Sequence, residues 1–584
     1  MAMKITFKLE KIIFCCLYCI FILQSCIHPS GNNTKSVAFK PSAQNDFLCG
    51  AEVLDKTWYS AEKKAPLFSG LDGIHFPITT KSTDAQKYFD QGLMLAYGFN
   101  HAEAARSFYE AGRQDSSCAM CWWGFAYVLG PNYNAGMEPD NLQRAYDAVQ
   151  KAKKLSSSGT QKEKDLVDAL ISRYAKDDKV KRPLLDSTYA SNMRQVYEKY
   201  PDDVDVAVLF AESLMNLHPW QLFSKDGTIQ PWTPEIIEVL KRALNKNPRH
   251  AGANHFYIHA VEMSKQPGDA LTSANLLRDL VPGAGHLVHM PSHIYIRTGQ
   301  YHEGVLSNLK AVLVDSLYTE ACHAQGVYPL AYYPHNYHFL AACATLCGES
   351  RYAYMGASET RLHAHENLLL DPAWATLQHY YTIPYYIQVK LGLWKDIQRS
   401  KEPEEQLKYP RVIWHYSQGM ADLSQNNTAK AKKHLREMKS IMQDSTIKKL
   451  TIWNINNLYD LCLIASHTLE GEIHASKQDY SRAISELREA ITMEDALNYN
   501  EPPDWFFSVR HNLGDILIQA GNYQEAIRVY EEDLHVIPEN GWALIGLMNA
   551  YEKLGQKNRY FEMKNRFEIA WKYADIKIVS SRIL

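Results

Sequence analysis

Apolar and small residues recur along much of the chain at the spacing of amphipathic helices, and the pattern is clearest near the C-terminus. Within residues 505–538, Gly514 precedes a turn at residues 521–523, and Ala526 and Tyr530 follow that turn one helical turn apart. This pattern predicts two antiparallel helices. The small residues would let the helices approach closely, while the tyrosine would fill the seam between them.

The same offsets return elsewhere in the chain. The further units are Gly471, Tyr480, Ala483, Leu487 and Ala490, then Gly92, Ala104, Phe108 and Ala111, and a looser set of Gly299, Tyr301, Gly304 and Ala311. These spacings match the tetratricopeptide repeat (TPR), and no segment shows the alternation of a half-buried strand. The sequence therefore predicts an all-α fold, a superhelical array of TPR-like helix-turn-helix repeats.

The N-terminus has the pattern of an export signal. Lys4, Lys8 and Lys11 precede an apolar run over residues 12–23, which is too short to span a bilayer and predicts a signal peptide over residues 1–25. The run ends in Leu23-Gln24-Ser25-Cys26. This motif resembles the bacterial lipobox, although Gln24 departs from its usual small residue, and the resemblance implies lipidation of Cys26. An ordinary cleaved signal beside a chance cysteine is the alternative.

The rest of the chain divides into three predicted parts. Residues 26–75 are expected to be the lipidated cysteine and a flexible tether, because residues 27–34 are polar and lack apolar periodicity. Residues 76–350 form an N-terminal TPR-like helical region with histidine-rich blocks, and residues 351–584 form a C-terminal TPR-like helical region. The anchor predicts a membrane-anchored lipoprotein of the cell envelope, and the absence of an acidic run after Cys26 favours the periplasmic side.

Charge and cysteine content narrow the class of protein. The formal net charge of −3 over 584 residues gives no sign of a nucleic-acid partner, because phosphate binding needs a clustered basic surface, so none is expected. After the leader and Cys26 are set aside, an odd number of cysteines remains, which is no disulfide framework. Cys118 and Cys121 have the spacing of a redox motif or half a zinc site, but we interpret them as buried helical cysteines.

Ten of the 23 histidines lie between His250 and His338. Several are spaced to share a helical face, at one-turn separations, and Pro291 is expected to begin the helix that holds His293. Imidazoles at this spacing, completed by a carboxylate, are typical of divalent transition-metal sites. The candidate ligands are His255, His259, Glu262, His289, His293, His335 and His338. A histidine-lined polar groove without metal is the alternative, and none of the spacings is the HExxH protease signature.

Longer polar and aromatic blocks carry a second signal. They lie at residues 97–101, 118–124, 129–134, 254–262, 282–297 and 501–507. Over residues 75–550 these blocks resemble a group of bacterial TPR proteins of undefined function. The resemblance implies a shared pocket on the concave face, for which the candidate residues are His101, Asn132, Asn134, Asn254, Glu501 and Trp505.

Three functions follow from these patterns. The leading hypothesis is an exported, lipid-anchored module that binds a protein or peptide in a concave groove lined by histidine and aromatic residues. The alternatives are a metal-dependent enzyme or metal-binding protein that uses the clustered histidines, and a glycan-binding outer-membrane lipoprotein. The chain has no phosphate-binding glycine loop and no GxSxG nucleophile motif, so an enzymatic activity is not assigned.

The anchor can be tested at Cys26. Cys26→Ala should move the protein from the membrane fraction to the soluble fraction, because two or three acyl chains bind a bilayer far more strongly than one. Fractionation followed by immunoblotting measures the change. Unchanged partitioning, or no lipid label on the unmodified protein, would contradict lipidation.

Overall fold

The structure is a computed structural model that describes residues 58–59, 63–177, 179–322 and 328–584. The signal sequence and Cys26 lie outside the described residues. The α-helices up to residue 346 are α3 (Thr83–Tyr97), α4 (His101–Gln114), α5 (Ala119–Leu129), α6 (Asn141–Leu155), α7 (Gln161–Ile171), α8 (Arg182–Lys199), α9 (Val204–Met215), α10 (Thr233–Lys246), α11 (Ala251–Val261), α12 (Leu271–Leu280), α13 (Gly285–His289), α14 (Pro291–Thr298), α15 (Tyr301–Cys322) and α16 (Tyr333–Leu346).

The remaining elements are also mostly helical. The later α-helices are α17 (Ser350–Leu362), α18 (Thr376–Lys390), α19 (Trp394–Arg399), α20 (Lys408–Ser424), α21 (Thr428–Ile441), α22 (Leu458–Ala475), α23 (Tyr480–Ala496), α24 (Arg510–Gln519), α25 (Tyr523–Val536), α26 (Gly541–Lys553) and α27 (Lys557–Ala570). Short 3-10 turns lie at Ser156–Ser158, Pro267–Ala270, Glu366–Leu368, Pro372–Trp374 and Ile447–Lys449, and a π-helical turn lies at Tyr328–Tyr332.

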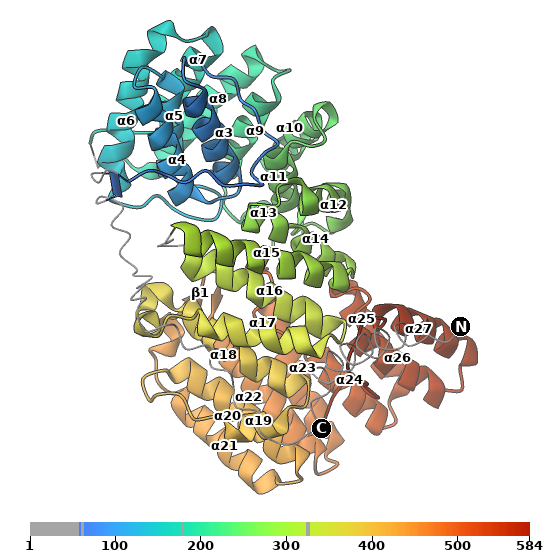
Figure 1. Cartoon of the computed structure of the whole chain (residues 1–584). Coiled ribbons are helices and arrows are strands. Elements are labelled where there is room, and N and C mark those ends of the chain that lie inside the picture. Colours follow the sequence, from blue (N-terminus) through green and yellow to red (C-terminus); the bar gives the residue numbers. More distant parts are fainter. Residues whose placement is uncertain (1–57, 60–62, 178, 323–327) are drawn as a thin grey trace, which may run out of the picture. The chain divides into compact units, whose positions relative to one another are not determined.

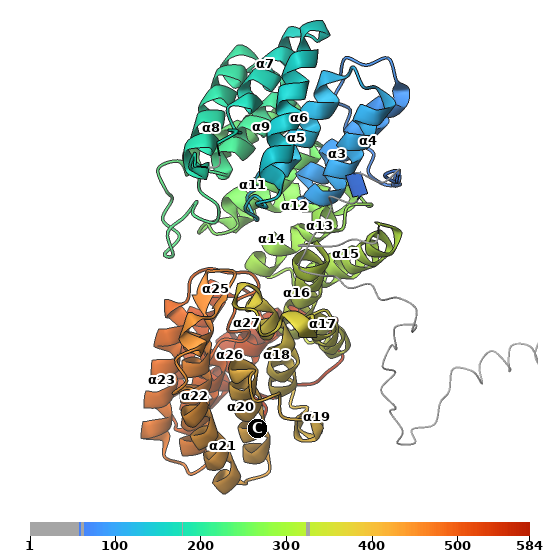
Figure 2. The same ribbon diagram turned by 90° about the vertical axis from the view of Figure 1, so that its left-hand side faces the viewer.

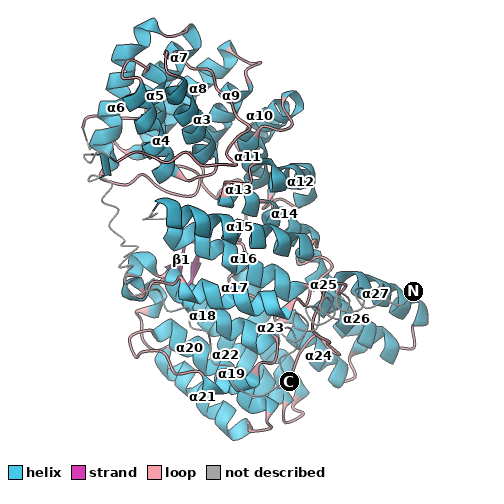
Figure 3. Ribbon diagram, viewed as in Figure 1, coloured by secondary structure: helices cyan, strands magenta, loops and turns pink. Residues whose placement is uncertain are grey.

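Strand structure is minimal among the described residues. β1 (Thr451–Ile452), labelled in Figure 3, pairs antiparallel with β2 (Asn456–Asn457). Phe223 forms an isolated bridge with Ile229. Successive helices pack on one another as pairs and the pairs stack in chain order, as Figures 1 and 2 show. The prediction of an all-α superhelical array of TPR-like repeats is confirmed.

Glycine–aromatic seams set the spacing of these pairs. The Tyr530 ring on α25 lies between Gly514 on α24 and Gly546 on α26, where neither glycine has room for a Cβ. The Phe108 ring on α4 is held in the same way between Gly92 on α3 and Gly124 on α5. The predicted register of these two repeats is therefore confirmed, because the small and aromatic residues meet as their spacing requires.

The buried core has two large parts and a small third cluster around Leu377 and Tyr380. The first runs from Leu71 to Tyr332 and the second from Ile296 to Ile578, so they meet near α14–α16, before the expected boundary at residue 350. The end of the expected tether is also packed, since Leu71 is buried in the first core and the Phe68 backbone N–H donates to Gln91 Oε1 at 2.8 Å. Apolar side chains at the end of a polar segment explain this packing.

Cys118 and Cys121 are buried, as expected, but they are bonded to each other as a disulfide. Cys118 is the N-cap of α5 and Cys121 lies in its first turn, which brings their Cα atoms to 5.6 Å. That separation lies in the usual range for disulfides. The predicted burial of these residues at a helix is confirmed, whereas their disulfide was not predicted.

The C-terminal segment crosses back over earlier helices. Arg582 Nη1 lies 2.6 Å from Glu472 on α22, and its Nε lies 2.9 Å from Asp515 on α24. Ser581 Oγ donates to the His511 carbonyl at 2.7 Å. The segment therefore covers part of the surface that these repeats share.

Among the described residues, no helix combines the length and the apolar character needed to cross a membrane.

The seam at Tyr530 can be tested by overpacking. Gly514→Leu should lower the free energy of unfolding by about 1–3 kcal/mol or more, because the added side chain must displace the tyrosine ring. Thermal and urea unfolding measure the change. Gly136→Leu is the matched control, since open space surrounds Gly136. Equal stability of the two variants would argue against this register.

Candidate metal centre

Four helices from different repeats bring six histidines together. α11 supplies His255 and His259, and α13 supplies His286 and His289. α14 supplies His293 and α16 supplies His335. As expected, Pro291 is the first residue of α14 and His293 lies inside that helix.

The six rings divide into two groups of three. The first triad is His255, His259 and His286, and the second triad is His289, His293 and His335. Within each triad one nitrogen of every ring lies within 4.8 Å of the others. Two nitrogens bound at 2.0–2.1 Å to one tetrahedral ion would be about 3.3 Å apart, so small ring movements would close either triad on an ion.

Fixed acceptors hold the Nδ1 atoms of three of these rings. His255 Nδ1 lies 2.6 Å from the Tyr97 carbonyl oxygen, and His259 Nδ1 lies 2.8 Å from Glu262 Oε1. His289 Nδ1 lies 2.7 Å from Asn308 Oδ1, whose amide nitrogen donates to the Gly304 carbonyl. Because each acceptor takes a proton from Nδ1, the Nε2 atom of each ring keeps its lone pair for another partner.

Two carboxylates complete the centre. His293 Nδ1 lies 2.7 Å from Glu262 Oε2 and 3.0 Å from Glu501 Oε2. Glu262 caps the C-terminal end of α11, and Glu501 comes from the loop between α23 and α24. Both carboxylates are buried, and Glu262 is fully inaccessible. We call the two triads with Glu262 and Glu501 the histidine centre.

The electrostatics keep most of the imidazoles neutral. Burial lowers the pKa of His255, His286, His289 and His335 well below the ordinary value, and neighbouring imidazoles add to this shift. Burial lowers the pKa of His259 as well. Neutral imidazole is the form that can bind a metal ion.

His293 and its carboxylates are the exception. Burial opposes the charge on His293, but Glu262 and Glu501 together raise its pKa to about 9. Burial also opposes the charge on Glu262, but His259 and His293 lower its pKa to about 2. Burial raises the pKa of Glu501 to about 7. Glu262 and His293 therefore form a buried ion pair.

Each triad packs against one phenylalanine. The centroid of the Phe99 ring lies 4.6 Å from that of His255, 5.7 Å from that of His259 and 5.6 Å from that of His286. The Phe339 ring lies 4.8 Å from His289, 4.5 Å from His293 and 5.0 Å from His335. These apolar walls exclude water and hold the imidazole rings in place.

Several of the polar and aromatic blocks identified in the sequence come together at the histidine centre. Residues 97–101 supply the Tyr97 carbonyl and Phe99, and residues 129–134 supply Tyr133, whose ring lies 5.3 Å from His259. Residues 254–262 and 282–297 supply five of the histidines and Glu262, and residues 501–507 supply Glu501. Segments far apart in the sequence thus share one local environment.

The structure departs from the predicted ligand set at two residues. His338 lies apart from both triads and stacks on Phe506, with ring centroids 4.9 Å apart. Three residues of α16 rotate its direction by about 60° from that of His335, which is enough to bring it against a different neighbour. His286 was not among the predicted ligands, although its i, i+3 relation to His289 on one helix was a signal for it. Asn308 carried no sequence signal, because its role depends on how α15 packs on α13.

The six predicted groove residues do not line one groove. Asn132 Oδ1 accepts from the backbone of Asn134 and Ala135, and Asn254 Nδ2 donates to the carbonyls of Pro248 and His250. His101 lies against the backbone of Val128 and Gly130, and burial lowers its pKa to about 4. Asn134 lies near Tyr332, whose ring is 4.9 Å from His286. Of the six, Glu501 alone touches a triad histidine in the described contacts.

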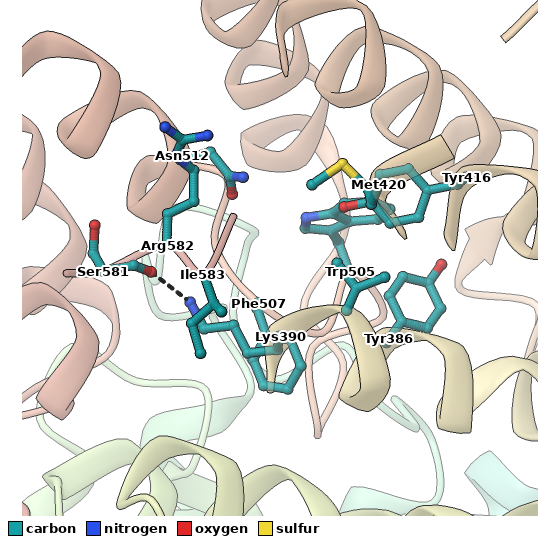
Figure 4. A pocket seen from close by; sticks show the side chains of 11 residues that line it. Tyr386, Lys390, Tyr416, Met420, Trp505, Phe507, Asn512, Ser581, Arg582 and Ile583 are labelled. Atoms are coloured by element: carbon teal, nitrogen blue, oxygen red, sulfur yellow. Dashed lines mark hydrogen bonds between the residues drawn. The ribbon is translucent and has the colours of Figure 1, made fainter. Parts of the chain in front are cut away.

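Trp505 lines a separate small cavity of about 40 Å³ (Figure 4). Tyr386 and Lys390 on α18 face it from one side and the C-terminal segment from another. Lys390 Nζ donates to the Ser581 carbonyl at 3.1 Å, and burial lowers the Lys390 pKa to about 7. This cavity is not part of the histidine centre.

Comparison with known proteins identifies one repeat. A tetratricopeptide repeat model matches residues 509–541, which hold α24 and α25. This match confirms the repeat predicted at residues 505–538. No curated protein matches the chain.

Solved structures of helical-repeat proteins also match. Human IFIT1, as a dimer with m7Gppp-AAAA, is 13% identical, and the match covers 85% of this chain and 92% of that one with a TM-score of 0.29. A monomeric IFIT1 mutant with Gppp-AAAA is 12% identical, with coverages of 84% and 91% and a TM-score of 0.30. Yeast Tom70 is 12% identical, with coverages of 81% and 90% and a TM-score of 0.25. These values are too low to transfer a ligand from either protein to this chain.

The buried ion pair can be tested in the metal-free protein. Glu262→Gln should lower the free energy of unfolding by about 3–5 kcal/mol at pH 6, because it leaves charged His293 without its main partner. Urea unfolding after treatment with a chelator measures this. Glu303→Gln is the control, since its pair with Arg278 is more than a third exposed and should contribute no more than about 1 kcal/mol.

The stability difference between the unmodified protein and Glu262→Gln should depend on pH, because the pKa values of Glu262 and His293 are both shifted in the folded state. The lowered pKa of Glu262 contributes stability above about pH 4.5 that is lost as the pH falls toward 2. The raised pKa of His293 contributes stability below about pH 6.5 that is lost as the pH rises through 9. The difference between the unmodified protein and Glu262→Gln should therefore be largest between pH 4.5 and 6.5. A difference independent of pH would contradict the pair.

Proposed function

We propose that this protein binds a transition-metal ion in the histidine centre, on a scaffold of TPR-like helix pairs. The observation that supports this is the orientation of the rings: His255, His259 and His289 each have Nδ1 on an acceptor. The Nε2 atom of His289 lies 3.0 Å from His293 Nε2, and the Nε2 atoms of His255 and His259 are buried without a hydrogen-bond partner among the described residues. Metal-binding histidines in proteins commonly have this arrangement, with the second ring nitrogen held by a carboxylate or carbonyl.

A hydrogen-bonded histidine cluster without metal is the competing interpretation. It accounts for the 3.0 Å contact between His289 Nε2 and His293 Nε2. It does not account for the first triad, where His255 Nε2, His259 Nε2 and both nitrogens of His286 are buried without a hydrogen-bond partner in the described chain. An unsatisfied buried polar group costs about 1–3 kcal/mol, and one ion would satisfy a nitrogen of each ring at once.

The ligand type narrows the choice of ion. Imidazole nitrogen suits zinc, copper, iron and nickel, whereas calcium and magnesium prefer oxygen ligands. The histidines are buried, apart from the partly exposed His335, so they do not form the open histidine-lined groove expected from the sequence. Buried Phe99, Tyr133 and Phe339 likewise form no open aromatic platform for a glycan.

Partner binding is a second candidate function. The tetratricopeptide match at residues 509–541 supports a repeat module of the kind that binds other proteins, because stacked helix pairs present extended surfaces. The C-terminal segment already contacts α18, α22 and α24. A protein or peptide partner would therefore bind another face of the array or displace this segment.

The location of the protein is a separate proposal. The leader and Cys26 support export, lipid attachment and a place in the cell envelope, facing the periplasm. Metal binding by the histidine centre does not depend on this location.

Metal binding can be measured directly. After treatment with a chelator, the full chain should bind Zn²⁺, and His259→Ala should weaken binding at the first triad more than about 100-fold, which exceeds the effect of losing an outer partner. Isothermal titration calorimetry measures the affinity. His302→Ala is the control, since His302 lies on α15 in a pair with Glu349 at 2.8 Å, away from both triads.

The affinity should also depend on pH in a defined direction. His293 must lose a proton before its second nitrogen can bind an ion, and its carboxylate partners raise its pKa to about 9. Affinity should therefore rise as the pH is raised from 7 to 9, with protons released on binding. Absence of binding, or equal losses in His259→Ala and His302→Ala, would contradict the proposed function.

A further inference from the structure

We infer that the histidine centre holds two metal ions, one in each triad, with Glu262 as an outer partner shared by both. This inference rests on the proposed metal binding and extends it to the number of ions and the role of each residue. It is argued from the two triads, the partners of their rings and the position of Glu262.

The first triad has the ligands of a complete three-histidine site. Its rings come from α11 and α13, and the nitrogens within 4.8 Å of one another belong to His255, His259 and His286. The Tyr97 carbonyl and Glu262 orient two of these rings. Three protein ligands with a fourth position open are typical of catalytic metal sites.

The second triad repeats this arrangement with different helices. His289 and His293 lie one turn apart across the junction of α13 and α14, and their Nε2 atoms are 3.0 Å apart. His335 on α16 completes the triad and is its most exposed member. Asn308 holds His289, and the two carboxylates hold His293. One nitrogen of every ring in this triad therefore lies near a common point, where an ion would replace the contact between His289 Nε2 and His293 Nε2.

Glu262 connects the two triads. Its Oε1 contacts His259 of the first triad and its Oε2 contacts His293 of the second, each through Nδ1. Both oxygens thus bind the outer nitrogens of rings whose Nε2 atoms face inward. A carboxylate in this position makes the ring a better ligand and fixes its orientation. The buried Glu262 carboxylate would therefore strengthen and orient one histidine ligand of each ion.

A single ion would not be bound by both triads. Each triad forms its own group within 4.8 Å, and the ring centroids of His259 and His293, on opposite sides of Glu262, are 5.8 Å apart. A third group of His293 with Glu262 and Glu501 could hold one ion through oxygen ligands. That site would use His293 Nδ1, Glu262 Oε2 and Glu501 Oε2, which are buried without a hydrogen bond in the described chain. It would leave the unpaired nitrogens of the three first-triad rings unsatisfied.

Cu²⁺ is a suitable probe for counting the ions. All six ligands of the inferred pair are imidazole nitrogens. Among divalent first-row ions, nitrogen sites bind Cu²⁺ most tightly. The open position on each ion would take a small ligand such as hydroxide.

The number of ions can be counted. The purified full chain is stripped with a chelator, loaded with excess Cu²⁺, desalted and measured by elemental analysis, and two copper ions per chain are expected. His255→Ala in the first triad and His335→Ala in the second should each keep one ion. His286→Gln, at a ring without side-chain hydrogen bonds in the described chain, repeats the first-triad test if His255→Ala fails to fold. His338→Ala should keep both ions, because His338 lies outside the triads.

Electron paramagnetic resonance gives an independent readout of the pair. Two adjacent Cu²⁺ ions should couple and reduce the signal, whereas each single-triad variant should show the full signal of one isolated ion. Glu262→Gln should keep both ions with about 10–100-fold lower affinity. Loss of one ion in that variant would make Glu262 a ligand and overturn its role as a shared outer partner.

The outcomes separate this inference from the proposed function. One ion in the unmodified chain, or loss of both ions in either single-triad variant, overturns the two-ion site and leaves metal binding intact. No ion in a folded unmodified chain overturns both.

Discussion

The buried charge of Glu262 is the constraint on which the histidine centre depends. A carboxylate without accessible surface needs partners, and Glu262 finds them in His259 on its own helix and His293 on α14. These contacts tie α11 to α14 and orient two imidazoles at once. Because a lone buried charge is costly, the carboxylate and its two histidines stabilise the fold only as a unit. The same contacts therefore determine both the geometry of the site and the packing of these helices.

The repeat architecture provides the rigid support. Phe108 and Tyr530 each lie between two glycines of neighbouring helices, so helix spacing is set by contact and not by long, adjustable side chains. Gly285 on α13 has a related role, because a Cβ at this position would collide with the Asp315 side chain on α15. Asp315 in turn accepts from Tyr328 and Asn336, which brings the start of α16 toward α13. His335 reaches the second triad through this packing.

The centre sits where the two parts of the core meet. Tyr295 of α14 belongs to the first part and Ile296 to the second, and His293 precedes them on the same helix. Glu501 comes from the loop before α24, more than 200 residues later in the chain, and lies 3.0 Å from His293 Nδ1. A site at such a junction can couple what binds there to the packing of both parts, since its ligands come from each.

The sequence alone determined the helical class, the register of the repeats at Gly92 and Gly514, and the helix start at Pro291, because local spacing controls all of these. It also identified five of the six triad histidines, since one-turn pairs share a face. The tertiary structure decided the rest. Only packing between distant helices could place His338 against Phe506, add His286 and Asn308, and show Trp505 in a separate cavity. Side-chain direction across helices depends on contacts that no local pattern encodes.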